Sequence, residues 1–151
     1  MNLSYLTNLA LEFRSALLKC DKNFLVGTLR AFPKGSCGEA SKLLAKYFKD
    51  MDQGVFYYVC GEVINDKKFQ SHAWLEKEDV IVDITADQFE EIKHPVIVTT
   101  NNSWYKQFGN LDSREINIEN YNDNAKVVML SSYRTIINNL KKEYRPKSWE
   151  K

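Results

Sequence analysis

The stretch Phe32-Pro33-Lys34-Gly35-Ser36-Cys37-Gly38-Glu39-Ala40-Ser41 organises this chain. Pro33 and Gly35 predict a turn, and apolar residues recur at helical spacing directly after it. The pattern predicts a helix over about 36–49, with Cys37 in its first turn. A thiol there faces unpaired backbone N–H groups and the positive end of the helix dipole, which favour the thiolate. Because the thiolate is the nucleophilic form of cysteine, we expect Cys37 to be reactive.

Three β-prone stretches follow this helix, at residues 55–64, 69–77 and 80–84. A hairpin-type connection over 65–68 separates the first two, and a tight turn at Glu78-Asp79 separates the last two. The spacing predicts a three-strand antiparallel meander packed against the helix that carries Cys37.

The flanking segments are predicted to be mainly helical. A first helix begins at Asn2 or Ser4 and ends at Cys20, and a last helix runs from about Asp123 or Asn124 to about Tyr144. Between the meander and the last helix we expect a helical turn over 85–91, a short strand over 95–99 and a long, partly ordered loop over 101–124. The last residues, after Pro146, are expected to fray. The predicted fold class is α+β, in a single domain covering 1–151.

Composition limits the classes of partner and compartment. The chain has 151 residues, 44% hydrophobic and 13% aromatic, which is typical of a folded globular protein. A net charge of +1 argues against nucleic acid as the main partner. No stretch approaches the ~20 apolar residues of a membrane span. The N-terminus has no signal-peptide pattern and the three cysteines make no disulfide framework, so we expect a cytoplasmic protein, with delivery to another cell also compatible.

Two further residues complete a candidate triad with Cys37. Alternate residues of a strand share a face, so His72 and Trp74 point one way while Asp83 lies at the end of the next strand. A buried Asp needs a partner, and an imidazole N–H supplies one. Cys37, His72 and Asp83 therefore predict a nucleophile, a general base and an orienting acid. His94 is a weaker alternative base.

Each of these residues also has an ordinary structural interpretation. Cys37 could be a small residue at a helix start, His72 a half-buried histidine, and Asp83 a cap for the following turn. The same three side chains could instead hold a catalytic zinc, although close ligand pairs are missing from the sequence.

The motifs Gly35-Ser36-Cys37-Gly38-Glu39-Ala40, Ser71-His72-Ala73-Trp74 and Val82-Asp83-Ile84-Thr85 resemble the core of one enzyme group. It is the transglutaminase-like and arylamine N-acetyltransferase-like branch of the papain-like cysteine-enzyme superfamily. The resemblance covers roughly 30–90. It implies a nucleophile-bearing helix on an antiparallel sheet, with Cys37, His72 and Asp83 in the catalytic roles.

The resulting hypothesis is a cysteine protease, a glutamine deamidase or a transamidase acting on a peptide or protein substrate without a cofactor. Backbone N–H groups near Cys37 would form the oxyanion hole. Trp74 and Trp104 are candidate walls of the substrate groove, although Trp74 is equally a candidate core residue. Gln88 is a candidate side-chain hydrogen-bond donor to the substrate. The alternative is a catalytically silent member of this fold that binds a protein partner through residues 104–118. A third hypothesis, a nucleic-acid binder, would need a basic patch of Lys141, Lys142, Arg145 and Lys147.

Overall fold

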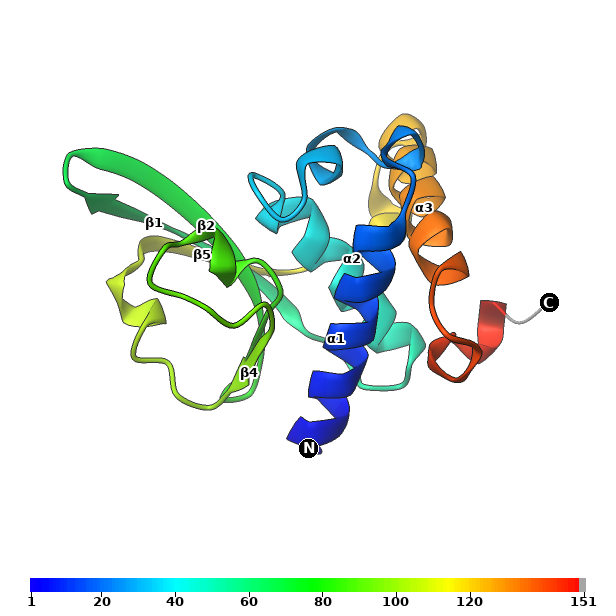
Figure 1. Ribbon diagram of the computed structural model, residues 1–151, viewed down its shortest axis with the longest axis horizontal. Coiled ribbons are helices and arrows are strands. Elements are labelled where there is room, and N and C mark those ends of the chain that lie inside the picture. The colour runs from blue at the N-terminus through cyan, green and yellow to red at the C-terminus, as the bar shows by residue number, and fades with distance from the viewer. Residues whose placement is uncertain (150–151) are drawn as a thin grey trace.

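The computed structural model describes residues 1–149, which form three α-helices, five β-strands and several short 3-10 turns. The fold is α+β, with the sheet on one side of the molecule and the helices on the other (Figure 1). The helices are α1 (Leu3–Lys19), α2 (Cys37–Asp50) and α3 (Asp123–Asn138). The strands are β1 (Tyr57–Asn65), β2 (Lys68–Lys77), β3 (Val80–Asp83), β4 (Ile97–Thr99) and β5 (Gly109–Glu115).

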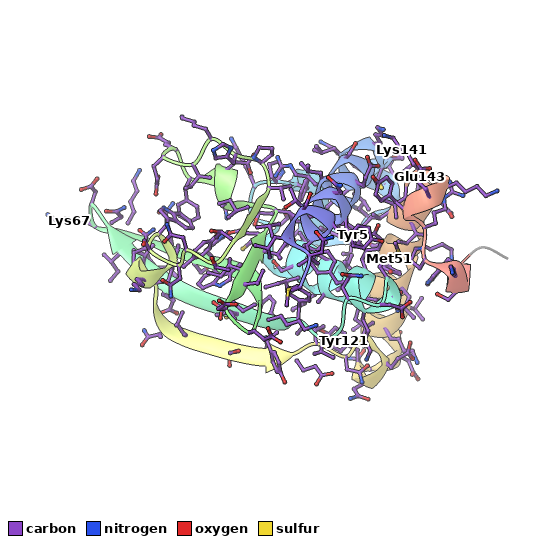
Figure 2. All side chains as sticks on the ribbon, turned by 90° about the horizontal axis from the view of Figure 1, so that it is seen from below. Tyr5, Met51, Lys67, Tyr121, Lys141 and Glu143 are labelled. Atoms are coloured by element: carbon purple, nitrogen blue, oxygen red, sulfur yellow. The ribbon has the colours of Figure 1, made fainter. Side chains whose placement is uncertain are left out.

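All strand pairs are antiparallel, and the strands lie in the order β4-β3-β2-β1-β5. The predicted meander is confirmed as β1, β2 and β3. Asp66 and Lys67 join β1 to β2 with φ values of 49° and 64°, so both turn residues are left-handed. Such a two-residue turn matches the right-handed twist of the strands. It closes a long hairpin arm whose tip, at Lys67, lies far from the helices (Figure 2).

The two faces of the sheet are covered differently. One face carries Leu75, Val80 and Val82 into the large apolar core, which all three helices complete. The other face carries Val59, Trp74 and Ile81 into a smaller, mainly aromatic cluster with Phe89, Tyr105 and Phe108. This alternation follows from the strand period of two, and it places His72 on the aromatic face.

Helix boundaries agree closely with the sequence pattern at the first two helices. Asn2 caps α1 by accepting a hydrogen bond from the N–H of Tyr5 at 3.0 Å, and Cys20 ends it. The predicted last helix is too long, because α3 ends at Asn138. The segment after it forms short 3-10 turns up to Trp149, and residues 150–151 of the expected frayed end lie outside the described residues.

The prediction for residues 101–124 also needs correction. This segment contains β5, which pairs with β1, and two 3-10 turns at Tyr105–Gln107 and Ile118–Asn120. All seven residues of β5 are exposed, so the strand has no alternation of apolar and polar residues. Pairing with β1 forms this strand, and the sequence pattern therefore could not reveal it.

Among residues 1–149, no helix combines the length and the apolar character needed to cross a bilayer.

Candidate active site

Cys37 is the first residue of α2, as the turn before it predicts. Gly35 has a φ of +65°, a left-handed conformation that glycine adopts without strain, and Ser36 is the residue before the helix. The N–H groups of Cys37, Gly38 and Glu39 precede the first backbone bond of the helix, from the N–H of Ala40 to the carbonyl of Ser36. They are the unpaired donors of a helix start. Three backbone donors are thus available beside the sulfur.

The first turns of α2 lie against an open edge of β2. The pairing of β2 with β3 covers Leu75, Glu76 and Lys77 only, so β2 has no strand partner on that side before Leu75. At Ala73 the helix supplies the missing contacts. The hydroxyl of Ser41 donates to the Ala73 carbonyl at 3.4 Å, and the Ala73 backbone hydrogen-bonds the Cys37 sulfur. The thiol therefore occupies the gap where β3 leaves β2.

His72 and Asp83 are held together by the register of β2 and β3. Leu75 lies opposite Val82, and extending that register by one residue puts Asp83 opposite Trp74 and diagonal to His72. The Nε2 atom of His72 lies 2.6 Å from Oδ2 of Asp83, and each residue is only 1% exposed. This part of the predicted constellation is present as a buried hydrogen-bonded pair.

Two further residues donate hydrogen bonds to Asp83. The N–H of Thr85 donates to its Oδ1 at 2.9 Å, and the hydroxyl of Tyr105 donates to its Oδ2 at 2.9 Å. Burial, together with the Asp83 charge, raises the pKa of Tyr105 above its ordinary value, so its hydroxyl stays a donor. These contacts satisfy a carboxylate that would otherwise be costly to bury.

The ionisation of Cys37 and His72 is coupled. Burial raises the pKa of the Cys37 thiol, but hydrogen bonding and charge from His72 outweigh burial, and the net pKa is lowered. Burial lowers the pKa of His72, but the charge and hydrogen bond of Asp83, with a smaller contribution from Cys37, raise it to about 9. The buried thiol of Cys20, by contrast, has its pKa raised by burial. The site thus lowers the pKa of Cys37.

Gln88 contacts the second nitrogen of the imidazole. Its Nε2 lies 2.9 Å from Nδ1 of His72, and an amide nitrogen can only donate. This contact favours a neutral ring that carries its proton on Nε2, whereas Asp83 favours the imidazolium. Gln88 is predicted from the sequence as a donor to substrate, whereas the structure places its amide on the histidine.

Aromatic rings enclose the histidine. The ring centroids of Phe89, Trp104 and Phe108 lie 5.1, 5.9 and 5.7 Å from that of His72. Trp104 is partly exposed, so its predicted place in a substrate wall is compatible with its position. Trp74 cannot, because it is 1% exposed and packs inside the aromatic cluster. Its interpretation as a core residue is therefore the correct one.

Sequence reasoning missed Tyr105 and Arg14. Tyr105 belongs to a segment predicted as loop, and nothing local marks it as a partner of Asp83. Arg14 of α1 is buried and pairs with Asp87 at 2.8 Å, while also donating to the carbonyls of Ile84 and Pro95. The position of Arg14 on the apolar stripe of α1 was the sequence signal that could have revealed its burial. Arg14 anchors the 3-10 turn Ala86–Gln88, and with it Gln88.

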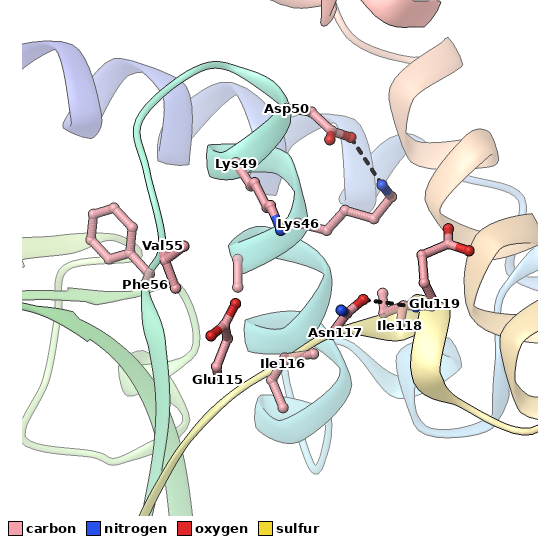
Figure 3. A pocket seen from close by; sticks show the side chains of 11 residues that line it. Lys46, Lys49, Asp50, Val55, Phe56, Glu115, Ile116, Asn117, Ile118 and Glu119 are labelled. Atoms are coloured by element: carbon pink, nitrogen blue, oxygen red, sulfur yellow. Dashed lines mark hydrogen bonds and ion pairs between the residues drawn. The ribbon is translucent and has the colours of Figure 1, made fainter.

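A small cavity of about 120 Å³ lies at the opposite end of α2 from Cys37 (Figure 3). Residues from the C-terminal half of the helix, the Val55-Phe56 segment and residues 115–119 line it, and none of the three triad candidates does. Within residues 1–149, no three His, Cys, Asp or Glu side chains are grouped so as to hold a metal ion.

Comparisons of the chain with family models, curated proteins and solved structures found no match.

Proposed function

We propose that this protein is a cysteine-dependent enzyme acting on an amide or acyl group, with the architecture of the transglutaminase-like branch that its motifs resemble. The observation that carries the proposal is the buried His72–Asp83 hydrogen bond beside a thiol whose pKa is lowered. A structural histidine needs no such carboxylate, and a structural cysteine needs no such base. The combination favours chemistry over packing.

In this mechanism Cys37 and His72 form a thiolate–imidazolium pair, and Asp83 orients the ring. The sulfur attacks the substrate carbonyl, and the first-turn N–H groups of α2 stabilise the oxyanion. Such a donor is worth about 3–4 kcal/mol in known enzymes. His72 then protonates the leaving amine, and water or a second amine resolves the thioester. Water gives a protease or a glutamine deamidase, and an amine gives a transamidase.

The hydroxyl of Ser36 is a candidate additional donor. It is buried next to Cys37 and has no hydrogen-bond partner among residues 1–149, although it occupies the position that normally caps a helix. A buried hydroxyl without a partner is costly. A bound acyl oxygen would satisfy it.

The test is the rate of Cys37 alkylation by iodoacetamide against pH, located by peptide mass spectrometry. Cys20 and Cys60 are free thiols in the same chain and serve as internal controls. We expect Cys37 to react at pH values well below the ordinary thiol pKa of ~8.5 and His72→Ala to abolish that reactivity. A Cys37 that titrates like a free thiol would contradict the proposal.

The second candidate is a silent member of this fold that binds a protein partner. The exposed edge strand β5 favours it, because free strand edges pair readily with other chains. Cys37→Ala separates the two hypotheses, since only the enzyme loses its function with this change.

A further inference from the structure

The hairpin arm has a free backbone edge that leads to Cys37. β2 is paired with β1 from Lys68 to Glu76, but on its other side the pairing with β3 begins only at Leu75. From Lys68 to His72 that side has no strand partner. Among residues 1–149, no backbone or side-chain group hydrogen-bonds the main chain of Phe69 or Ser71 there.

The direction of these backbone groups follows from the hairpin register. Asn65 and Lys68 flank the two-residue turn and form a hydrogen-bonded pair, and hydrogen-bonded pairs then alternate along the ladder. Phe69, Ser71 and Ala73 therefore direct their N–H and C=O groups away from β1. The contact of the Ala73 carbonyl with Ser41 agrees with this assignment.

A groove follows the same edge. Its volume is about 320 Å³, with Asn65, Asp66, Lys68 and Gln70 of the arm on one wall and residues 88–91 on the other. Gln88 lines the groove and also contacts His72, so the groove leads towards the histidine of the candidate site. An extended chain lying in it would run beside Phe69 and Ser71 towards the sulfur.

The side chains of the arm present different chemistry on its two faces. Ile64 and Phe69 are opposite each other in the register and are 76% and 63% exposed. They lie on the face that also carries Ala73, which is the side of α2. The other face carries polar groove residues, among them Gln70. An added strand would therefore meet apolar side chains on one face and polar ones on the other.

We propose that the open edge of β2 binds the substrate as an added antiparallel or parallel strand, so that the substrate is an extended polypeptide segment. Pairing with Phe69 and Ser71 would bring the next substrate residue up to the Cys37 sulfur, which already contacts the Ala73 backbone. The edge thus supplies affinity through main-chain hydrogen bonds and positions one carbonyl for attack. This inference rests on the proposed thiol chemistry.

The experiment compares chloromethyl ketones with the same reactive group and different lengths. The short probe is acetyl-Ala chloromethyl ketone, and the long probe is acetyl-Ala-Ala-Ala chloromethyl ketone. In each reaction the Cys37 sulfur bonds to the methylene carbon and chloride leaves. Strand addition predicts that the long probe labels Cys37 about tenfold faster or more, because it adds main-chain hydrogen bonds. Equal rates would overturn the inference.

N-methylated long probes test the strand geometry. Alternate amides of a strand point towards its partner, so methylating one internal amide should remove most of the advantage while methylating its neighbour should not. A loss that is equal at both positions, or absent at both, would overturn strand pairing.

Ser71→Pro removes the outward N–H, and Ser71→Ala is the matched control that keeps it. Proline is tolerated where a strand N–H faces solvent. We expect Ser71→Pro to label normally with the short probe and to lose the advantage of the long one, with Ser71→Ala unchanged in both. If Ser71→Pro fails to fold, the N-methylated probes test the main-chain hydrogen bonds between substrate and strand edge on the unaltered protein.

Two other outcomes are distinguishable. If the short probe shows that Cys37 is an unactivated thiol, the proposed function fails. The strand edge can still be tested by the ratio of the labelling rates of the long and short probes at pH ~9.5, because an ordinary thiol is ionised there. If the edge instead pairs with a second copy, sedimentation will show a dimer that Ser71→Pro dissociates. A long probe without advantage on that dimer would overturn substrate binding.

Discussion

The two nitrogens of His72 have partners with opposite preferences. Asp83 accepts a hydrogen bond from the Nε2–H group of the ring and favours the imidazolium. The Gln88 amide nitrogen donates to Nδ1 and favours the neutral ring. In the proposed mechanism the ring must pass through both states. The imidazolium protonates the leaving amine, and the neutral ring then accepts a proton from the resolving water or amine. Gln88 is therefore a positioning residue that balances the two.

Replacing Gln88 tests this balance. Gln88→Leu removes the donor that favours the neutral ring, so the pKa of His72 should rise and the Cys37 thiolate should form at a lower pH, by about 0.5 to 1 pH unit for one hydrogen bond. Iodoacetamide labelling of Cys37 against pH measures the shift. Gln70→Leu is the control, because Gln70 lines the same groove and makes no hydrogen bond to His72. A shift to higher pH would show that Gln88 instead supports the charged ring.

At the scale of elements, the packing around His72 depends on how closely β1 approaches Phe108 and Leu111. Gly61 of β1 lies opposite His72, so a side chain there would point to the aromatic face. A Cβ atom at Gly61 would lie 2.8 Å from Cβ of Phe108 and 2.7 Å from a methyl group of Leu111. The glycine therefore allows Phe108 to cover the histidine.

Gly61→Ala should consequently reduce the free energy of unfolding by about 1–3 kcal/mol, as overpacking does. Denaturant unfolding measures the loss, and slower labelling of Cys37 should accompany it because Phe108 must move. Gly27→Ala is the control, since a Cβ at Gly27 meets no atom within 4 Å. If the two variants are equally stable, the close packing around Gly61 is not what holds Phe108.

For the whole molecule, the shifted pKa of His72 makes stability depend on pH. A histidine whose pKa rises from 6.5 to about 9 on folding adds stability that is complete below about pH 6.5 and lost as pH rises through about 9. The lowered pKa of Cys37 acts with the opposite sign. Its contribution is present above the ordinary thiol pKa and is lost as pH falls through the lowered value.

Cys37→Ser removes the opposing thiol and exposes the histidine contribution. We expect the free energy of unfolding of this variant to fall by about 1–3 kcal/mol between pH 6.5 and 9, since one pKa unit corresponds to about 1.4 kcal/mol. Denaturant titrations across this range measure it. Adding Asp83→Asn should flatten the slope of unfolding free energy against pH, because Asp83 is the main group that raises the pKa of His72. An equally steep slope in the double variant would assign it to other residues.

The sequence by itself determined the elements whose pattern is local. Apolar spacing and turn residues were sufficient for α1, for α2 and for the meander, because each depends on which residues are buried one turn or two residues apart. The same reasoning located Cys37 at a helix start, and His72 and Asp83 on neighbouring strands. These positions follow from strand alternation and chain order.

Only the tertiary structure decided what depends on contacts between distant segments. β5 is exposed throughout and exists because it pairs with β1, and Tyr105 and Arg14 reach the site from segments far along the chain. The open edge of β2 is likewise decided by where β3 and α2 lie, since no local pattern records an absent neighbour. Local periodicity predicts which residues are buried. The partners of single polar groups are set by the packing of distant segments, which the sequence alone does not reveal.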